Sequence, residues 1–401
     1  MGTGMRADLT GAGWPARTGL KALTRALGAD NIRWVGGVIR DSLLGQDVRD
    51  IDCATRLLPD AVIDRCREAG IRTIPTGIEH GTVTALLVDG TVEITTLRRD
   101  VSTDGRRATI AFADDWREDA ARRDFTINAL YAHPETLEIS DYFGGLHDLR
   151  NRRVRFIGDA RQRIREDHLR ILRYFRFQAR FGADPDEEAE SACAELAATL
   201  KGLSRERVAM ELLNLLGLPA PLRALQRMKA LGVLDIILPE ACQPGLAALE
   251  RLLGSEHAAG VPPEPIRRLA AILPPHAETA EAVAARLRLS RGQRAKLISL
   301  AEREPSDLES PKALAYCEGL GNAIDRILLQ QGDVAVFSGW EIPQFPLKGG
   351  QIIARGVTAG PRVAGLLRQI EQSWINEGFP DQDRVRKLLD EALTRENPSN
   401  A

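Results

Sequence analysis

The sequence has 401 residues, an apolar content of 44% and a formal net charge of −2 at pH 7. A chain of this length predicts more than one domain, or one domain with a long extension, around a packed core. A net charge so close to zero excludes a protein that attracts polyanions over its whole surface. Contact with nucleic acid would therefore need a local basic patch.

The cysteine pattern and the hydropathy favour a cytoplasmic protein. The five cysteines are scattered and form no Cys-x-x-Cys pair, which argues against a zinc site and a disulfide scaffold and fits a reducing compartment. No apolar run reaches transmembrane length, so we expect no membrane partner. The N-terminus lacks the layout of a secretory signal, and helical spacing of Leu20, Leu23 and Leu27 favours the start of the fold over a transit peptide.

Residues 1–150 carry a mixed pattern of helices and strands. The predicted elements are, in chain order, helix 20–27, strand 32–35, helix 38–44, strand 50–54 and helix 59–69. A hairpin is predicted over 83–97, because Asp89-Gly90 joins two β-rich runs. Residues 101–120 are polar and charged, which predicts a mobile surface loop.

Beyond about residue 150 the strand signals mostly disappear. Leu, Ala, Arg and Glu recur at helical period to the C-terminus, with breaks at Pro/Gly clusters. We therefore predict an α+β protein. Its predicted parts are a mixed α/β head over 1–150, a helical neck over 151–220, a helical body over 221–335 and a helical tail over 336–401.

Two aspartates, Asp50 and Asp52, alternate on a predicted strand. Alternate strand side chains share a side, so these carboxylates project together, about 7 Å apart, while Ile51 and Cys53 face the core. Such a pair can hold two divalent cations during a phosphoryl displacement, and hard oxygen ligands suit Mg²⁺. Glu93, on the second hairpin strand, is the candidate third carboxylate. An isolated Asp-x-Asp would equally fit solvated edge residues.

A glycine pair, Gly36-Gly37, lies between a predicted strand and a predicted helix. Glycines let the backbone approach a ligand closely, and the start of a helix offers free N–H groups to a phosphate. Arg40, one turn into the helix, adds a cation. The pair alone predicts only a turn, but with Asp-x-Asp on the next strand it predicts a triphosphate site.

The segment around Arg122-Arg123-Asp124 suits the sugar and phosphates of a nucleotide. Arg123 can pair with phosphate, while Asp124 and Asn128 can reach ribose hydroxyls. An exposed salt-bridge patch on a helix is the alternative interpretation.

The segment 166–170, Glu-Asp-His-Leu-Arg, suits the reading of a base. Asp167 and Arg170 are three residues apart, which predicts that they share a helical face. Asp167 can accept from an exocyclic amino group and Arg170 can donate to the adjacent ring nitrogen. Cytosine and adenine match this order, whereas guanine and uracil do not, so CTP and ATP are the predicted substrates. Arg173 and Arg176 rotate away from Asp167, as in an amphipathic Arg-rich helix.

Together these segments resemble the signature of the polymerase-β-type nucleotidyltransferases. More closely, they resemble the class II tRNA nucleotidyltransferases of bacteria, the CCA-adding enzymes, and their sister poly(A) polymerases. The resemblance is specific over residues 30–180 and implies a small mixed-sheet head followed by an elongated all-α part. It implies transfer of CMP, CMP and AMP from CTP and ATP to the 3′ end of tRNA without a nucleic-acid template. It also implies that Arg173 and Arg176 line the nucleotide site.

Two segments favour one branch of the family. Residues 76–82 resemble the CCA-adding enzymes, where poly(A) polymerases carry a basic-aromatic segment, and residues 100–107 fall at a flexible loop associated with the switch from C to A. The basic stretch 150–180 is expected near RNA phosphates. Four alternatives stay open: a poly(A) polymerase, a partial CC- or A-adding enzyme, a catalytically silent tRNA-binding protein, and a nucleotidyltransferase for a small molecule.

Overall fold

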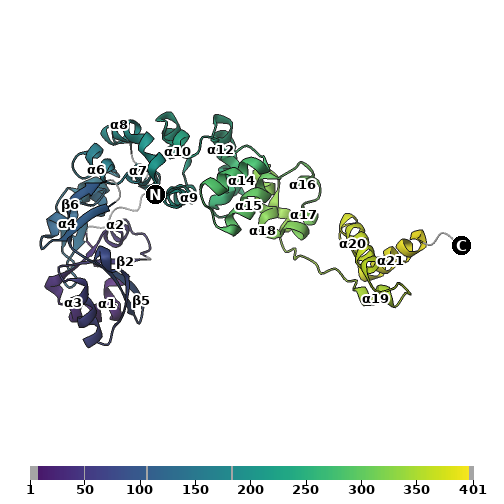
Figure 1. The fold of residues 1–401 in the computed structure, drawn as a ribbon, viewed down its shortest axis with the longest axis horizontal. Helices are drawn as coiled ribbons and strands as arrows, with labels where there is room; N and C mark the ends of the chain where they lie inside the picture. Colours follow the sequence, from purple (N-terminus) through teal and green to yellow (C-terminus); the bar gives the residue numbers. More distant parts are fainter. Residues whose placement is uncertain (1–7, 49, 105–106, 182–183, 397–401) are drawn as a thin grey trace. The chain divides into compact units, whose positions relative to one another are not determined.

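The computed structural model describes residues 8–48, 50–104, 107–181 and 184–396. The chain divides into two compact units, Met1–Pro239 (unit 1) and Glu240–Ala401 (unit 2). Unit 1 combines a mixed sheet with helices, whereas the described residues of unit 2 form helices and connecting segments (Figure 1). The predicted α+β class is confirmed, and the finer division at 150, 220 and 335 stays a prediction. None of the described helices combines the length and apolarity that a membrane crossing needs.

Unit 1 is built on a seven-stranded sheet with the order β3-β4-β5-β2-β1-β8-β9. The strands are β1 (Ile32–Val35), β2 (Ile51–Thr55), β3 (Arg72–Gly77), β4 (Thr82–Leu87), β5 (Gly90–Thr96), β8 (Leu130–Ala132) and β9 (Ile139–Asp141). The β2–β5 pair is parallel, and the other neighbours are antiparallel. Strand β2 therefore lies inside the sheet, between β5 and β1.

Alternation along β4 and β5 gives this part of the sheet one packed side. Val83 and Ala85 of β4, and Val92 and Ile94 of β5, are each at most 1% exposed. Helix α3 (Pro59–Glu68) contacts β3 and β4, and it also contacts α1 (Thr18–Leu27). The core of this region lies on that side, and the intervening Thr82 and Thr84 of β4 and Glu93 and Thr95 of β5 point the other way.

The predicted elements of the head largely match the structure. The predicted strand 32–35 coincides with β1, and helix 38–44 corresponds to α2 (Gly37–Leu43). The hairpin is confirmed: β4 and β5 are antiparallel, and Leu87 faces Gly90.

The prediction of a loop over 101–120 was wrong. Strands β6 (Arg98–Asp104) and β7 (Arg107–Phe112) pair in a separate hairpin, and α4 (Trp116–Ala121) follows. β-branched residues such as Val101, Thr103 and Ile110 favour strands despite the charges between them. Residues 105–106 of the predicted loop lie outside the described residues.

Strand β3 forms one edge of the seven-stranded sheet. Its register with β4 shifts between Ile74 and Gly77, and Pro75 lies within the shift. Proline has no backbone N–H to donate, so the ladder of hydrogen bonds is interrupted here. The Ile74 side chain at this edge is 46% exposed.

The helices after the sheet complete unit 1. They are α5 (Gly145–Arg150), α6 (Ala160–Glu166), α7 (Arg170–Phe181), α8 (Glu187–Leu196), α9 (Arg205–Leu216), α10 (Leu222–Ala230) and α11 (Val233–Ile237). The buried side of α7 presents Tyr174 and Phe177 to Phe125, with ring centroids 6.4 and 5.2 Å away. Aromatic packing thus fixes α7 against the segment that follows α4.

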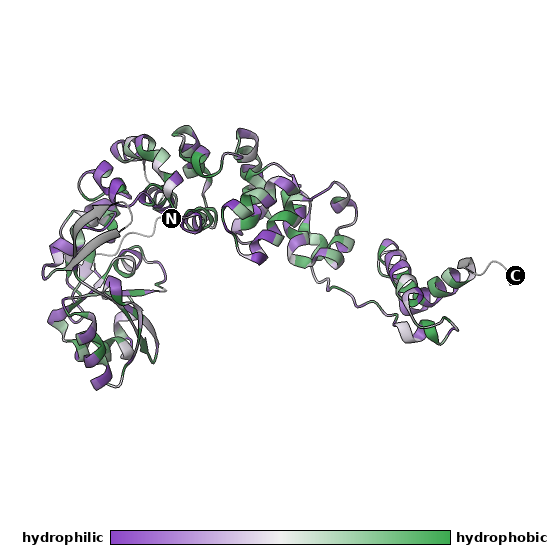
Figure 2. Cartoon of the chain, viewed as in Figure 1, coloured by the Kyte–Doolittle hydropathy of each residue, from purple (hydrophilic) through white to green (hydrophobic). Residues whose placement is uncertain are grey.

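Unit 2 consists of amphipathic helices. They are α12 (Gln243–Ala258), α13 (Pro265–Ile272), α14 (Ala277–Arg286), α15 (Arg291–Ala301), α16 (Ser306–Glu309), α17 (Pro311–Glu318), α18 (Leu320–Leu329), α19 (Gly349–Ile353), α20 (Pro361–Asn376) and α21 (Gln382–Glu396). Figure 2 shows hydrophilic and hydrophobic residues alternating along them. Leu366, Ile370 and Trp374 of α20 pack with Val385 and Leu389 in one buried cluster.

Candidate active site

A glycine turn joins β1 to α2. Gly36 has φ +74°, a backbone conformation that favours glycine, and a Cβ there would lie 3.3 Å from Arg123 Nη1 and 3.6 Å from the Asn128 carbonyl oxygen. The Gly36 N–H donates to the Leu130 carbonyl at 3.1 Å. Gly37 begins α2. The predicted glycine pair therefore lies directly against the predicted segment 123–128.

Two of the predicted carboxylates are neighbours on adjacent strands. Asp52 of β2 lies in register with Glu93 of β5, and both are exposed between buried residues. Asp50 immediately precedes β2 and is also exposed. The pKa of Asp52 is raised, first because the surrounding protein limits its hydration and then because Glu93 and Asp50 repel its negative charge.

These carboxylates suit a divalent cation. Their oxygens are hard donors, and a cation would relieve the repulsion that raises the pKa of Asp52. Within the described ranges, no three His, Cys, Asp or Glu side chains gather closely enough to hold an ion by themselves. A direct metal contact from Glu93 stays a prediction.

Arg40 is buried within the site. Its side chain, in a residue 5% exposed, donates to Asn128 Oδ1 at 2.5 Å and to both oxygens of Asp41 at 2.8 and 3.0 Å. Phe177 and Phe181 lie beneath the guanidinium, with ring centroids at 5.2 and 5.1 Å. Arg40, the residue predicted to bind a phosphate, is thus oriented from two sides, by Asn128 and by Asp41.

Asn128 connects Arg40 to the next predicted residue. Its Nδ2 donates to Asp124 Oδ1 at 3.0 Å, while Arg173 donates to Asp124 Oδ2 at 2.7 and 2.5 Å. Burial opposes ionisation of Asp124, but Arg173 and Asn128 outweigh it and lower the pKa of this carboxyl. The structure therefore brings Arg40, Asn128, Asp124 and Arg173 together in one hydrogen-bonded chain.

Arg123 is positioned by an acid that the sequence reasoning missed. Arg123 donates to the Tyr131 hydroxyl at 2.9 Å and to Asp119 Oδ2 at 3.3 Å, and Tyr131 donates to the same Asp119 oxygen at 2.7 Å. Asp119 is 2% exposed. The i,i+4 spacing of Asp119 and Arg123 was the available signal.

The predicted base-reading pair is arranged differently from expectation. Asp167 precedes α7, where its backbone carbonyl accepts from Arg170 N and its Oδ1 accepts from Leu169 N. Arg207 of α9 donates to Asp167 Oδ2 at 2.8 Å. The expectation of a shared helical face was wrong, because the chain turns between α6 and α7 at Asp167.

Arg170 is held by neighbours other than Asp167. It donates to Glu166 Oε2 at 2.7 Å and to the carbonyls of Arg163 and Arg122 at 2.8 and 2.9 Å. Its side chain is 12% exposed. Arg170 thus ties the start of α7 to the arginine motif, and its contact with a base stays a prediction.

A second missed acid, Glu211, organises the remaining arginines. Glu211 of α9 is 2% exposed; Arg176 donates to its Oε2 at 2.6 Å, and Arg173 Nη1 lies 3.7 Å from its Oε1. Glu211 is 35 residues beyond Arg176 in the sequence, so no local spacing signalled the pair.

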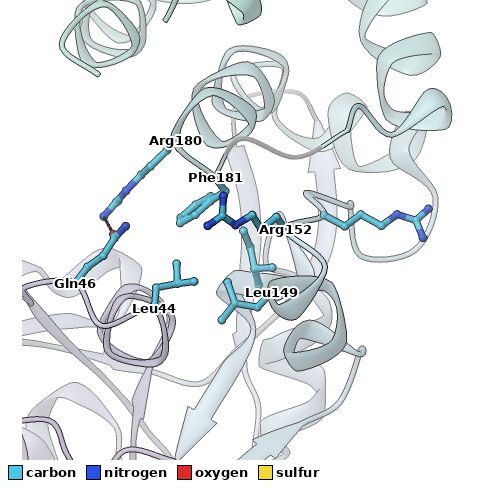
Figure 3. A pocket seen from close by; sticks show the side chains of 8 residues that line it. Leu44, Gln46, Leu149, Arg152, Arg180 and Phe181 are labelled. Atoms are coloured by element: carbon cyan, nitrogen blue, oxygen red, sulfur yellow. Dashed lines mark hydrogen bonds between the residues drawn. The ribbon is translucent and has the colours of Figure 1, made fainter. Parts of the chain in front are cut away.

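The end of α7 is also tied to α2, beside a small cavity. Arg180 donates to Asp41 Oδ2 at 3.0 Å and to Gln46 Oε1 at 3.2 Å. Figure 3 shows Arg180 and Phe181 facing Gln46 and Leu44 across this cavity of about 110 Å³. None of the predicted site residues lines it.

The family comparisons agree with this geometry. Residues 32–155 match a family model described as the poly A polymerase head domain, and residues 183–243 match one described as a probable RNA- and SrmB-binding site of polymerase A. The first match includes the glycine turn, the carboxylates and the arginine motif. The fold and the site together assign this chain to the class of nucleotidyltransferases.

Individual relatives narrow this class. The chain is 36% identical to the mitochondrial CCA tRNA nucleotidyltransferase 1 of Mus musculus, over 90% of this chain and 87% of the relative. It is 39% identical over 221 residues to the CCA-adding enzyme of Streptococcus sanguinis, covering 55% of this chain and 54% of that one. The crystal structure of the Bacillus stearothermophilus CCA-adding enzyme in complex with CTP matches with a TM-score of 0.73 and 26% identity, over 96% of this chain and 99% of that chain. The chain belongs to the class II tRNA nucleotidyltransferase family, the CCA-adding enzymes, whose members use divalent metal ions.

Proposed function

We propose that this protein adds CMP, CMP and AMP from CTP and ATP to the 3′ end of tRNA, without a nucleic-acid template. The observation that carries the proposal is the juxtaposition of Asp52 and Glu93, in register on β2 and β5, with the Gly36 turn one strand away. The relatives named for CCA addition support the choice of reaction. The mouse relative is mitochondrial, and a cytoplasmic location for this chain is proposed from its five free cysteines.

The chemistry assigned to the site is an in-line displacement at the α-phosphorus. The terminal ribose hydroxyl of tRNA attacks, and diphosphate leaves. Arg40 and Arg123, which border the Gly36 turn, neutralise the triphosphate, while Asp124 and Asn128 fix the sugar. Most of the rate acceleration then comes from positioning and charge neutralisation.

Asp50 and Asp52 are the proposed ligands of Mg²⁺, with Glu93 beside them. When bound, the metal supplies charge neutralisation at the entering and leaving oxygens. The pKa of Asp52 is raised first by its limited hydration and then by the charges of Glu93 and Asp50, and the second cause supports this assignment because a cation would offset the repulsion.

Asp167 is proposed to select cytosine and adenine, with Arg170 as its partner. The Asp167 oxygen that would accept from the amino group also accepts from Arg207. This contact is partly exposed, at 44% for the Arg207 side chain and 35% for Asp167, so an incoming base can replace it. Base selection therefore begins when the amino group of the incoming base replaces Arg207 as the donor to Asp167 Oδ2.

The decisive experiment follows incorporation of each labelled triphosphate into tRNA transcripts that end before, within and after CCA. We expect CTP to extend the first, ATP to complete the second and neither to extend the third. Asp52→Ala should incorporate nothing while it still binds tRNA. If wild type and variant are equally inactive and both bind tRNA, the protein is a silent tRNA-binding member of the family.

The same assay separates the other members of the family. Long A tails on generic RNA with ATP alone would identify a poly(A) polymerase, whose head-domain model this chain matches. Extension that stops after CC would identify a partial enzyme. We expect neither outcome, because residues 76–82 resemble the CCA-adding branch.

A further inference from the structure

One side of the β3–β4–β5 region presents hydroxyl groups beside the proposed metal site. In a row across the sheet, Asp52 is opposite Glu93, Glu93 is opposite Thr84, and Thr84 is opposite Ile74. The adjacent row pairs Thr95 with Thr82. We call the side formed by Thr76, Thr82, Thr84, Glu93 and Thr95 the threonine face.

The threonine face is the side of the sheet turned away from the core. The residues between its members, such as Val83, Ala85 and Ile94, are buried at 1% exposure or less. Thr76 and Glu93 are exposed, and Thr82, Thr84 and Thr95 are half-buried. α3 packs on the same β3 and β4 strands, where buried Val83 and Ala85 place the core on the opposite side.

The hydroxyls of this face retain capacity to donate. Thr76 Oγ1 lies 2.9 Å from Thr84 Oγ1, and Thr82 Oγ1 lies 3.2 Å from Thr95 Oγ1. Each hydroxyl carries one proton, so one proton of each pair satisfies the pair and the other can serve an external acceptor. Phosphodiester and ribose oxygens are such acceptors.

The strand order indicates which of the two substrates lies against the threonine face. The nucleotide residues come from the β1–α2 turn and from the segment before β8, on one side of β2. β5, β4 and β3 lie on the other side of β2. In an in-line displacement the entering and leaving oxygens are on opposite sides of the phosphorus, so the attacking hydroxyl arrives from the β5 side.

On the basis of the proposed function, we infer that the threonine face binds the 3′-terminal nucleotides of the acceptor RNA. Thr84 and Thr76 donate to the sugar-phosphate backbone next to the attacking hydroxyl. Exposed Ile74, opposite Thr84, provides an apolar contact, and Arg72, exposed on the same strand, pairs with a phosphate. The surface continues directly from the carboxylates at which the reaction takes place.

The test replaces hydroxyls by methyl groups of similar size. We expect the double variant Thr76→Val/Thr84→Val to raise the KM for tRNA about fivefold per lost hydrogen bond and to leave the KM for CTP unchanged. The matched control is Thr73→Val on the same strand. Thr73 is in register with Ala85, which is fully buried, so Thr73 belongs to the core side of the sheet and not to the threonine face. Arg72→Ala should weaken RNA binding and reduce the slope of log K against log salt concentration by about one.

Two other outcomes of these measurements would overturn the inference. An unchanged KM for tRNA in the double variant and an unchanged salt slope in Arg72→Ala would overturn the inference. A lower kcat with an altered metal requirement and an unchanged KM for tRNA would overturn it too, because the threonines would then only position Glu93. Thermal melting of each variant checks folding. Failure of the proposed function itself appears separately, as absence of CMP incorporation by the wild type.

Discussion

Both units of this protein bury charged networks, but the two networks differ in what surrounds them. In unit 2, Glu256 accepts from Arg267 and from Arg268, and Arg267 also donates to Asp325 at 2.5 Å. These residues are at most 3% exposed and join α12, α13 and α18. In unit 1, the chain from Arg40 through Asn128 and Asp124 to Arg173 borders the Gly36 turn.

The difference teaches that buried charge alone does not indicate a substrate site. The charges of the Glu256 network are paired with one another, and Lys296 Nζ forms an ion pair with the remaining oxygen of Asp325 at 2.7 Å. The network around Asp124 borders the Gly36 turn, and on the neighbouring strands Asp52 and Glu93 are exposed, with the charge of Glu93 helping to raise the pKa of Asp52. Exposed carboxylates that repel one another therefore indicate a cation or substrate site more strongly than buried ion pairs do.

The largest expected effect is on catalysis, through Asp52. Asp52→Asn should lower kcat at least about 10²-fold, because a metal-holding charge is lost. It should also raise the melting temperature near neutral pH. The raised pKa means that the folded state binds a proton on Asp52 more readily than the unfolded chain, so ionisation opposes folding as pH rises. A variant that retains activity would exclude Asp52 as a ligand.

The next prediction compares the Asp124 network of unit 1 with the Glu256 network of unit 2. Arg173→Ala leaves Asp124 buried without its main partner, and we expect it to reduce the free energy of unfolding by about 3 kcal/mol and to raise the KM for CTP. Glu256→Gln should reduce stability by a similar amount of about 3 kcal/mol without changing the KM for CTP. Urea unfolding and steady-state kinetics measure both. Equal effects of the two variants on the KM for CTP would contradict the division into site and scaffold.

A smaller effect is expected at Asn128, which joins two charged residues without carrying charge. Asn128→Ala removes both hydrogen bonds and leaves Arg40 and Asp124 each short of a partner, at a cost of about 1 to 3 kcal/mol. We expect kcat/KM for CTP to fall about tenfold, which is about 1.4 kcal/mol. Arg67→Ala, at an exposed pair with Asp64 on α3, is the control and should leave kcat/KM for CTP unchanged.

The smallest effect is a shift in pH dependence. Because the pKa of Asp52 is raised, protons compete with the metal at higher pH than at an ordinary aspartate, and activity should fall as pH is lowered. Glu93→Gln removes one cause of the raised pKa, so the acid limb of its residual activity should move to lower pH. Profiles at several metal concentrations measure the shift. An acid limb that stays in place would show that Glu93 does not act on Asp52.

Local patterns predicted much of the head. The Asp89-Gly90 turn fixed the β4–β5 hairpin, and alternation correctly placed Asp52 and Glu93 outside the core. The hairpin β6–β7 was missed because its charges suggested a loop, whereas its β-branched residues determine the conformation.

Long-range pairing could not be predicted. Glu211 meets Arg176 across 35 residues, and Arg207 meets Asp167 across 40. Both contacts depend on how α9 packs against α7, which no local spacing records. The break at Asp167, between the end of α6 and the start of α7, was also absent from the helical spacing of the sequence.

Pro75 has a consequence for the behaviour of many copies of this chain. An edge strand with unpaired N–H groups and an exposed isoleucine invites strand addition by another molecule. At β3 the register shift around Pro75 makes the strand irregular between Ile74 and Gly77, which spoils that template. The sheet can therefore keep an apolar side chain at its rim without promoting intermolecular β-pairing and aggregation at high protein concentration.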